Sequence, residues 1–495
     1  MKQSVLSLAP SVPLTQQRMP LYEALHTYSQ SGVTPFDVPG HKMGATTNTL
    51  QQAFGDVLGL DVNSMKELDL LSHPQGVIAE AQSLAAEAFG ADEAFFLVNG
   101  TTIGILAMIM ATCAPGETLL VPRNGHKSVM DGIILSGARP IFIQPEVDVH
   151  FGIAHGVSVA SVARAITTNP SAKVLLVTYP TYFGAMSELT EICELAHQHN
   201  ITVIVDGAHG AHLGFMPNGK DALACGADAV TLSMHKTAGS LTQSSLLLLQ
   251  TKRITKASVQ KVLGMLQTTS ASYLLMSSLD IARHELVCHG KERYAQLLPL
   301  IKQATKQIEA GGHYEVLKQA YVNERFAQHY DMTKLVVRVN SLGLTGFEVY
   351  TLLKEQYNIQ MELAEGYVVM AVITPADTTT SLQRLVDALL AIEKDHAKGM
   401  TVLSLHVTPD EVNELVVCPR EAYYASQETI VIDEAEGRIS ADTLMIYPPG
   451  IPLVIPGEKI SRDVIAQYHY YNKTIGNVLM EAGSAHHITV IKEHA

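Results

Sequence analysis

One lysine, Lys236, stands directly after an apolar stretch that is typical of a buried strand. The segment "SMHKTAGSLTQSS" (233–245) follows the apolar run "DAVTL" (228–232), so the lysine lies among small and hydroxyl side chains. A buried ammonium is costly unless it is paired or gives up its charge. A lysine that condenses with an aldehyde to form an imine avoids this cost, and desolvation makes its amine more nucleophilic. Lys236 is therefore a candidate for imine chemistry, and a lysine that reaches to the surface is the alternative.

An acidic residue, Asp206, ends another apolar stretch, "VIVDGAHGAH" (203–212). A carboxylate at the end of a buried strand needs a cationic partner, and the protonated nitrogen of a pyridine ring is one. A helix cap is an alternative, and so is a metal site formed by His209 and His212. No further histidine or carboxylate is placed to complete a set of metal ligands, so we predict no metal.

A third segment, "VNGTTIG" (98–104), has the features of a phosphate site. An apolar strand gives way through Gly100 to a helix, whose first N–H groups are free to bind an anion, and the hydroxyls of Thr101 and Thr102 add donors. An ordinary helix cap is the alternative. The nucleotide-binding pattern G-x-x-x-x-G-K-[ST] is absent from the sequence. A phosphate cradle, a strand-end carboxylate and a strand-end lysine, in this order, match the requirements of pyridoxal 5′-phosphate.

The elements that must position these residues alternate between helix and strand. Helices are expected at 76–91, from 101 and at 189–200. The strand candidates are "EAFFLV" (93–98), "TLLVPR" (118–123), "RPIFIQ" (139–144), "KVLLVTYP" (173–180), "ITVIVDG" (201–207) and "AVTLSM" (229–234). Apolar strands that alternate with helices predict an α/β fold with a mostly parallel sheet covered on both faces. A ligand is then expected at the carboxyl ends of the strands.

The pattern changes after "SSLLLLQ" (244–250). Longer helices follow, including 290–310, and then a second α/β segment with strands at 334–340 and 367–373. The polar stretch 393–400 is interpreted as a linker. The tail beyond it holds "YPPGIPLVIPGE" (447–458), whose proline and glycine residues favour turns.

The composition limits the possible partners and location. The 495 residues are 47% hydrophobic, enough for two or three domains, and the net charge of −14 is spread without long runs. No basic stripe is present for nucleic acid, and the apolar run 103–114 is shorter than the roughly 20 residues of a membrane span. Five well-separated cysteines without a C-x-x-C pair favour a reducing compartment. The sequence shows no signal peptide, so we expect a cytoplasmic location and neither a nucleic-acid nor a membrane partner.

Seven segments together resemble those of one enzyme family. They are "PGHKMG" (39–44), "LDLLSHPQGVIAEAQSLAAEAFGA" (68–91), "NGTT" (99–102), "PRNGHKS" (122–128), "DGAH" (206–209), "SMHK" (233–236) and "YPPGIPLVIPGE" (447–458). In these segments the chain resembles the Orn/Lys/Arg decarboxylases, in particular the shorter bacterial arginine/lysine decarboxylases. The resemblance spreads over nearly the whole chain.

The resemblance implies the aspartate-aminotransferase fold, fold type I of the pyridoxal-phosphate enzymes. The expected parts are an N-terminal arm (1–52), a large cofactor-binding domain (53–285) with a mostly parallel, seven-stranded type of sheet, a small α/β domain (286–398) and a C-terminal α+β domain (399–495). Larger, acid-inducible relatives carry a wing domain where only about forty residues precede "PGHKMG" here. We therefore expect no ring assembly that depends on such a wing.

The resemblance also implies roles for individual residues. Lys236 is similar to the lysine that forms the internal aldimine with the cofactor, and Asp206 to the partner of the pyridine nitrogen. Ser233 and His235 join Thr101 and Thr102 as phosphate ligands. The remaining assignments are His126 stacked on one face of the ring, Ala208 on the other, and His209 near the phenolic oxygen or the substrate carboxylate, at a position where the larger relatives have an aromatic residue.

The implied activity is decarboxylation of a basic L-amino acid, with Lys236, His126 and His209 as catalytic residues. Arginine, giving agmatine for polyamine biosynthesis, is favoured; lysine and ornithine are alternatives, as are another lyase, an aminotransferase or a non-catalytic paralogue. Lys236 or His209 is expected to protonate Cα. The distal cationic group is expected at Glu458 or Asp69, although either could be a turn or cap residue. The site is expected near the interface of at least a homodimer, lined by residues 35–44 and "YPPGIP".

Overall fold

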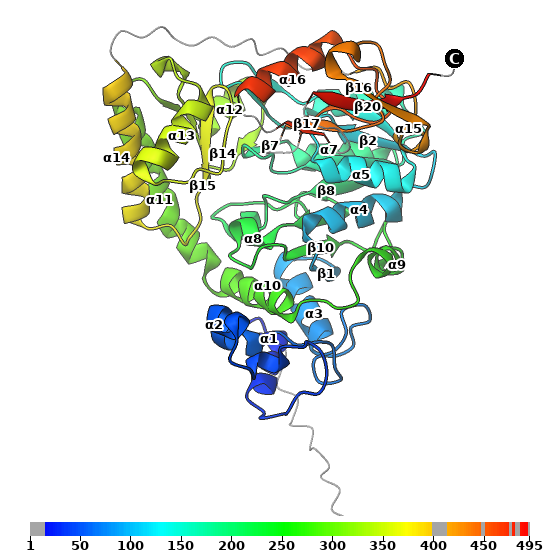
Figure 1. Ribbon diagram of the computed structural model, residues 1–495, viewed down its shortest axis with the longest axis vertical. Coiled ribbons are helices and arrows are strands. Elements are labelled where there is room, and N and C mark those ends of the chain that lie inside the picture. The colour runs from blue at the N-terminus through cyan, green and yellow to red at the C-terminus, as the bar shows by residue number, and fades with distance from the viewer. Residues whose placement is uncertain (1–14, 398–412, 447–450, 475–477, 481–485, 494–495) are drawn as a thin grey trace, which may run out of the picture.

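The computed structural model describes residues 15–397, 413–446, 451–474, 478–480 and 486–493 (Figure 1). Its centre is one seven-stranded sheet with the order β1-β10-β9-β8-β6-β2-β3. The strands are β1 (Glu93–Leu97), β2 (Thr118–Pro122), β3 (Arg139–Ile143), β6 (Val174–Thr178), β8 (Thr202–Asp206), β9 (Ala229–Leu232) and β10 (Ser245–Leu249). All neighbours are parallel except that β10 runs antiparallel to β1 and β9. The predicted α/β fold with a mostly parallel sheet is confirmed.

Apolar residues cover both faces of this sheet. On β8, Val203 and Val205 belong to one core cluster and Ile204 to another, because successive side chains of a strand point to opposite faces. The helices of the first cluster include α3 (Val77–Phe89), α6 (Val159–Thr168), α7 (Leu189–Gln198) and α10 (Tyr273–Glu285). Those of the second are α4 (Gly100–Thr112), α5 (Lys127–Ser136) and α9 (Lys256–Leu266). Strands buried on both faces explain why the sequence shows continuous apolar runs.

A second, antiparallel sheet with the order β11-β13-β15-β14 forms the small domain. Its strands are β11 (Glu315–Val316), β13 (Lys334–Arg338), β15 (Val368–Val372) and β14 (Leu363–Ala364). The helices around it are α11 (Lys291–Ile308), α12 (Gln319–Phe326), α13 (Gly346–Tyr357) and α14 (Thr379–His396), with α11 and α14 on the outer side (Figure 1). A two-stranded pairing of β12 (His329–Tyr330) with β7 (Ala185–Met186) joins this part to the large domain.

The prediction of a linker at 393–400 is wrong for residues 393–396, which belong to α14. Helix α14 continues to His396 because Glu393 is buried and accepts hydrogen bonds from the backbone N–H and the ring of His313, both at 3.0 Å. Residues 398–400 lie outside the described residues. The predicted domain boundaries stay predictions.

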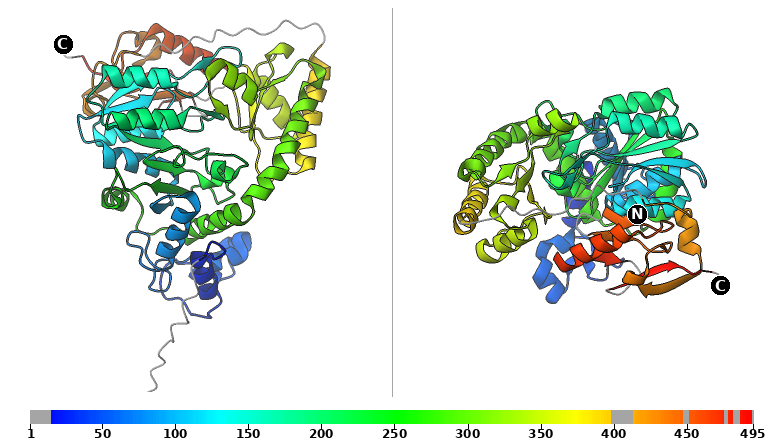
Figure 2. Two further views of the ribbon diagram at one scale, coloured as in Figure 1. Left: turned by 180° about the vertical axis from the view of Figure 1, so that it is seen from behind. Right: turned by 90° about the horizontal axis from the view of Figure 1, so that it is seen from above.

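The C-terminal part contains two small antiparallel sheets, β16-β20 and β18-β17-β19. It lies beside the large domain, where α15 packs against α5 (Figures 1 and 2). Its elements are α15 (Pro419–Tyr424), β16 (Gln427–Val431), β17 (Leu444–Ile446), β18 (Ile451–Val454), α16 (Arg462–Thr474), β19 (Val478–Met480) and β20 (His487–Ile491). The mixture agrees with the expected α+β domain.

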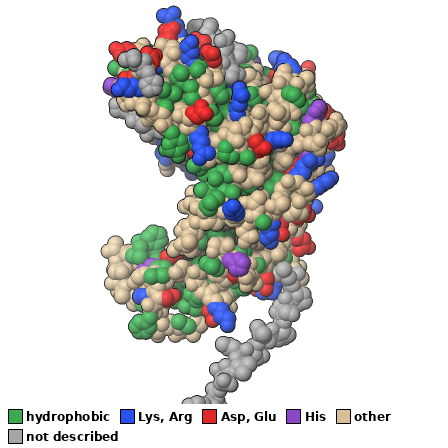
Figure 3. All heavy atoms as spheres, turned by 90° about the vertical axis from the view of Figure 1, so that its right-hand side faces the viewer, with side chains coloured by type: hydrophobic (Ala, Val, Ile, Leu, Met, Phe, Trp, Pro, Cys, Tyr) green, Lys and Arg blue, Asp and Glu red, His purple; other side chains and the backbone are tan. Residues whose placement is uncertain are grey.

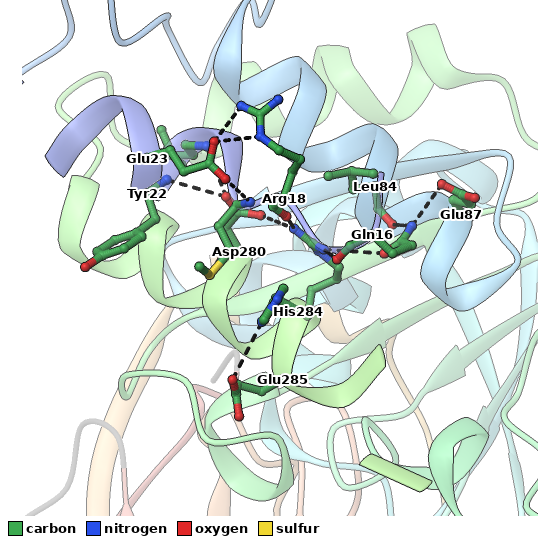
Figure 4. Close-up of polar contacts among 12 residues, drawn as sticks. Gln16, Arg18, Tyr22, Glu23, Leu84, Glu87, Asp280, His284 and Glu285 are labelled. Atoms are coloured by element: carbon green, nitrogen blue, oxygen red, sulfur yellow. Dashed lines mark hydrogen bonds and ion pairs between the residues drawn. The ribbon is translucent and has the colours of Figure 1, made fainter. Parts of the chain in front are cut away.

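A buried ion pair anchors the N-terminal segment to α10 (Figure 4). Arg283, which is fully buried, donates to Asp280 at 2.6 Å and to the carbonyl oxygens of Gln16 and Arg18 at 2.6 and 2.5 Å. Asp280 accepts hydrogen bonds from the backbone N–H groups of Leu21 and Tyr22, at the start of α1 (Pro20–Ser29). The carboxylate therefore caps a helix that lies far away in the sequence.

Shorter elements complete the description. They are η1 (Lys42–Gly44), α2 (Thr49–Phe54), η2 (Gly55–Gly59), β4 (Val147–Asp148), β5 (Ile153–Ala154), η3 (Leu213–Phe215), α8 (Met234–Thr237), the π-helical turn η4 (Leu286–Gly290), η5 (Glu309–Gly311), η6 (Asn340–Leu342) and η7 (Ile432–Glu434). No helix among the described residues has the length and apolar character needed to cross a membrane.

Helix α4 lies against the sheet at Gly104, and we predict that this contact tolerates no side chain. A Cβ at Gly104 would overlap the Oγ1 of Thr231 on β9 and lie 2.9 Å from the Leu97 Cδ1. Gly104→Ala should therefore lower the free energy of unfolding by about 1–3 kcal/mol through overpacking. In the control Gly264→Ala, on α9, the new Cβ meets open space and should add about 0.5–1 kcal/mol through helix propensity. Chemical denaturation measures both, and equal stabilities for the two variants would contradict the prediction.

Candidate functional site

A pocket of about 400 Å³ opens at the carboxyl edge of the parallel strands. All ten residues assigned to the site from the sequence line it, although they come from four separate segments. They are Gly100, Thr101, Thr102, His126, Asp206, Ala208, His209, Ser233, His235 and Lys236. The sheet register explains this convergence, because parallel strands end at the same edge.

Asp206 is the last residue of β8 and is 4% exposed. Among the described residues, its carboxylate accepts one hydrogen bond, from the backbone N–H of Ala208 at 3.1 Å. A buried carboxylate with capacity for a further donor can bind and retain a protonated ring nitrogen. Asp206 can therefore serve as the partner of a pyridine nitrogen, as the sequence pattern predicts.

Lys236 lies on α8, the short helix that follows β9. Its Nζ is 2.9 Å from the Nε2 of His209 and 5.7 Å from the centre of the Tyr182 ring. Burial lowers the pKa of the Lys236 amine, although the charges of Asp206 and Glu362 act in the opposite direction. A lowered pKa increases the fraction of free amine, which is the nucleophile in imine formation.

His209 is a buried neighbour of both Lys236 and Tyr182. Its ring centre lies 4.5 Å from that of Tyr182, and its Nδ1 has no hydrogen-bond partner among the described residues. Burial, followed by the charges of Lys236 and Lys334, holds the pKa of His209 well below its usual value. A neutral ring that accepts at Nε2 from Lys236 satisfies this contact, so we assign the ring hydrogen to Nδ1.

The phosphate cradle consists of the start of α4 and the turns around it. Gly100 has a φ of +71° and donates its N–H to the carbonyl oxygen of Gln243 at 2.8 Å. The Thr101 hydroxyl contacts those of Ser233 and Ser245, and the Thr102 side chain is exposed. The helix start and these hydroxyls provide several donors, which suits a phosphate dianion.

His126 and Ala208 provide two walls of the pocket. The Nδ1 of His126 accepts a hydrogen bond from the backbone N–H of Ser128 at 3.2 Å and caps α5. The rest of the ring is open to the pocket, while partial desolvation lowers its pKa. Together with the cradle, Lys236 and Asp206, these walls fit the phosphate, aldehyde and pyridine nitrogen of pyridoxal 5′-phosphate.

The sequence interpretation missed other lining residues, among them Thr178, Tyr182, Gln243 and Glu362. Thr178 lies opposite Asp206 in the register of β6 and β8, so its strand-end position was the available signal. Gln243 has a φ of +81°, a strained conformation that composition does not reveal. Glu362 comes from the small domain and accepts a hydrogen bond from the Tyr182 hydroxyl at 2.5 Å.

The two carboxylates suggested for the distal cationic group do not line this pocket. Asp69 accepts hydrogen bonds from the N–H groups of Gly76 and Ile78 at 2.7 and 3.1 Å, as a cap at the start of α3. Glu458 is fully buried and forms an ion pair with Arg123 at 2.9 Å. Because Arg123 precedes the pocket residues Asn124 and His126, this pair fastens the C-terminal part to the loop that carries them.

Other suggestions also change. His209 and His212 have different partners, since His212 contacts Asp331 at 3.1 Å, so they do not face one ion. Residues 35–44 do not line the pocket of their own chain. Tyr447–Gly450 of the "YPPGIP" segment lie outside the described residues.

Comparisons with known proteins agree with this geometry. The model of the Orn/Lys/Arg decarboxylase major domain matches residues 19–381, and that of the C-terminal domain matches 405–479. An arginine decarboxylase of Bacillus subtilis (strain 168) is 42% identical, covering 97% of this chain and 99% of the relative. An arginine decarboxylase of Halalkalibacterium halodurans is 40% identical with the same coverage. A lysine decarboxylase structure from Francisella novicida has a TM-score of 0.83 at 19% identity, covering 96% of this chain and 81% of that chain.

Proposed function

The chain belongs to the Orn/Lys/Arg decarboxylase family of pyridoxal-phosphate-dependent enzymes, and we propose that it converts L-arginine to agmatine and CO₂. The observation that carries the proposal is the meeting of Lys236, Asp206 and the phosphate cradle in one pocket. The arginine decarboxylases that are 40–42% identical over nearly the full chain support the choice of substrate. Agmatine would place the enzyme in polyamine biosynthesis.

The chain's residues divide the work of holding the cofactor. Lys236 would hold it covalently through Nζ, and Asp206 would keep the pyridine nitrogen protonated. The phosphate would be bound by the start of α4 with Thr101, Thr102, Ser233 and His235. His126 and Ala208 keep the ring between them. When bound, pyridoxal phosphate supplies the electron sink for the electron pair that remains when CO₂ leaves.

The contact between His209 and Lys236 supports a role in proton transfer to Cα. Their nitrogens are 2.9 Å apart, within the distance for direct proton transfer. When its amine is free, Lys236 could hold a proton near Cα of a bound substrate while His209 accepts a hydrogen bond from it. The rings of Tyr182 and Phe183 line the same wall and exclude water from the site.

Glu362 is our candidate for the distal guanidinium of arginine. It lines the pocket, and Tyr182 orients its carboxylate by donating the hydrogen bond at 2.5 Å. A carboxylate and a planar guanidinium form two parallel hydrogen bonds, which favours arginine over lysine or ornithine. Glu362 thus replaces the earlier candidates Asp69 and Glu458.

A dimer is the assembly we propose, with a second copy covering the pocket edge. Residues 33–70, here called the N-terminal lobe, expose large apolar side chains. Figure 3 shows hydrophobic groups on the lower lobe of the molecule. The exposed residues are Val33, Phe36, Val38, Leu50, Phe54, Val57 and Leu70. Leu241, beside the pocket residue Thr242, is also 50% exposed. Apolar surface of this extent is typical of an interface that is buried in the assembly.

The substrate assignment predicts which amine the purified enzyme releases. With equal concentrations of L-arginine, L-lysine and L-ornithine supplied separately, agmatine and CO₂ from arginine should form fastest. Chromatography of the amines and trapping of the CO₂ measure this. A preference for lysine or ornithine would contradict the substrate, and keto-acid formation without CO₂ would contradict the reaction.

The proposed role of Glu362 predicts that its substitution lowers the activity on arginine. Glu362→Gln removes one charge-assisted pair and should lower kcat/KM for arginine about 10- to 100-fold, mainly through KM. The control Glu355→Gln, on the exposed side of α13, should leave the kinetics unchanged. Unchanged kinetics in Glu362→Gln would refute this assignment.

The proposed dimer predicts that charge in the N-terminal lobe separates the subunits. Phe36→Lys combined with Phe54→Lys should reduce the sedimenting mass from that of at least a dimer to that of a monomer. Tyr424→Lys, an equally apolar and exposed site in the C-terminal part, is the control. A wild-type protein that sediments as a monomer would contradict the proposal.

A further inference from the structure

Lys334 is a fully buried cation without a hydrogen-bond partner. Its side chain is 0% exposed, and its Nζ makes no hydrogen bond to any residue that the structure describes. Most lysines are at the surface, and an ammonium that is buried without a partner destabilises the folded protein. Such a residue calls for a function that offsets its cost.

Asp331 does not satisfy the ammonium with a hydrogen bond. Asp331, three residues earlier, accepts hydrogen bonds from the N–H and the hydroxyl of Thr333 at 3.0 and 2.7 Å. Its other oxygen lies 3.1 Å from the Nε2 of His212. Asp331 thus offers Lys334 a counter-charge, although its Oδ2 makes no hydrogen bond to any described residue and so does not pair with the ammonium.

Lys334 lies directly behind the pocket wall. Its stem packs on Gly184, where an added Cβ would lie 2.9 and 3.0 Å from the Lys334 Cγ and Cβ. Gly184 follows the pocket residues Tyr182 and Phe183, and its carbonyl oxygen accepts the N–H of Asp331 at 2.8 Å. The pairing of β12 with β7 therefore fixes the lysine against the wall on which the Tyr182 ring contacts His209.

The charge of Lys334 acts on His209, and the charges of Lys236 and Glu362 act on Lys334; all three of these partners line the pocket. It contributes to the low pKa of His209, and its own pKa is lowered to about 8 by burial first, with the charge of Lys236 acting in the same direction. The carboxylates of Asp331 and Glu362 oppose this shift. Because interaction between charges is mutual, a protonated Lys334 also disfavours a proton on the nitrogens that it faces.

We propose that Lys334 is a positioning residue of this site, whose buried ammonium keeps the His209 ring neutral and disfavours a proton on the Lys236 nitrogen. Two consequences follow for the proposed reaction. A neutral His209 accepts the hydrogen bond from Lys236, and the Lys236 nitrogen loses its proton at a lower pH. The inference needs the cofactor in the pocket, as the proposed function does, but it needs no particular substrate.

The groups that face Lys334 come from every element packed around it. Asp331 precedes it on the turn after β12, and the Tyr330 hydroxyl donates to its carbonyl oxygen. His209 and His212 lie in the loop after β8, Lys236 on α8 and Glu362 just before β14. Among these groups, Asp331 and Glu362 are the acidic side chains.

The test is a pH titration of the visible absorbance of the bound cofactor, which reports the proton on the Lys236 nitrogen without any substrate. In Lys334→Met, removal of a positive charge should raise the midpoint by about one pH unit. Lys334→Arg, which keeps the charge, should titrate like wild type. If Lys334→Met does not fold, Lys334→Gln replaces it with the same expected increase.

Two controls separate charge from packing. Arg283→Met also removes a fully buried cation, but at the N-terminal anchor, and Thr333→Val disturbs the cluster without changing its charge. Both should lose stability and keep the wild-type midpoint. A midpoint that is unchanged in the neutral Lys334 variants, or that rises equally in Thr333→Val, would overturn the inference. Failure to decarboxylate arginine would contradict only the proposed function.

Discussion

The desolvation of one amine, that of Lys236, is the constraint on which the site depends. The residue follows a strand whose side chains are buried on both faces, so its amine is poorly solvated and its pKa is lowered. The charges of Asp206 and Glu362 limit this lowering of the pKa. The Nε2 of His209 lies 2.9 Å from the Lys236 amine and accepts a hydrogen bond from it. The balance gives a lysine that can exchange one imine partner for another.

The remainder of the fold holds the neighbours of this amine in place. The parallel register sets Asp206 beside Thr178, and the absence of a side chain at Gly104 lets α4 bring the phosphate cradle close to β9. The Arg123–Glu458 pair fastens the loop of His126 to the C-terminal part. Each contact joins segments that are separate in sequence, so the pocket depends on packing between distant parts of the chain.

Residues on the large sheet could be predicted because their signals are local. An apolar run that ends abruptly in Asp206 or Lys236 predicts a strand end, and parallel strands end at one edge. Glu362 and Lys334 carry no such signal, since their approach to the pocket depends on the pairing of β12 with β7 and on the packing of Lys334 over Gly184. Glu458 was wrongly considered as a ligand of the distal cationic group because it lies in a turn motif in the sequence. Its ion-pair partner, Arg123, lies 335 residues away, so the sequence does not reveal that Glu458 is buried.

The central claim is the covalent attachment of pyridoxal phosphate at Lys236, and peptide mass spectrometry after borohydride reduction tests it most directly. The account predicts that protein purified with ample vitamin B6 is coloured, and that reduction adds a phosphopyridoxyl mass to the peptide containing Lys236. That mass should be absent from the same peptide of Lys236→Ala. A colourless protein, or a modification found on another lysine such as Lys334, would contradict the account.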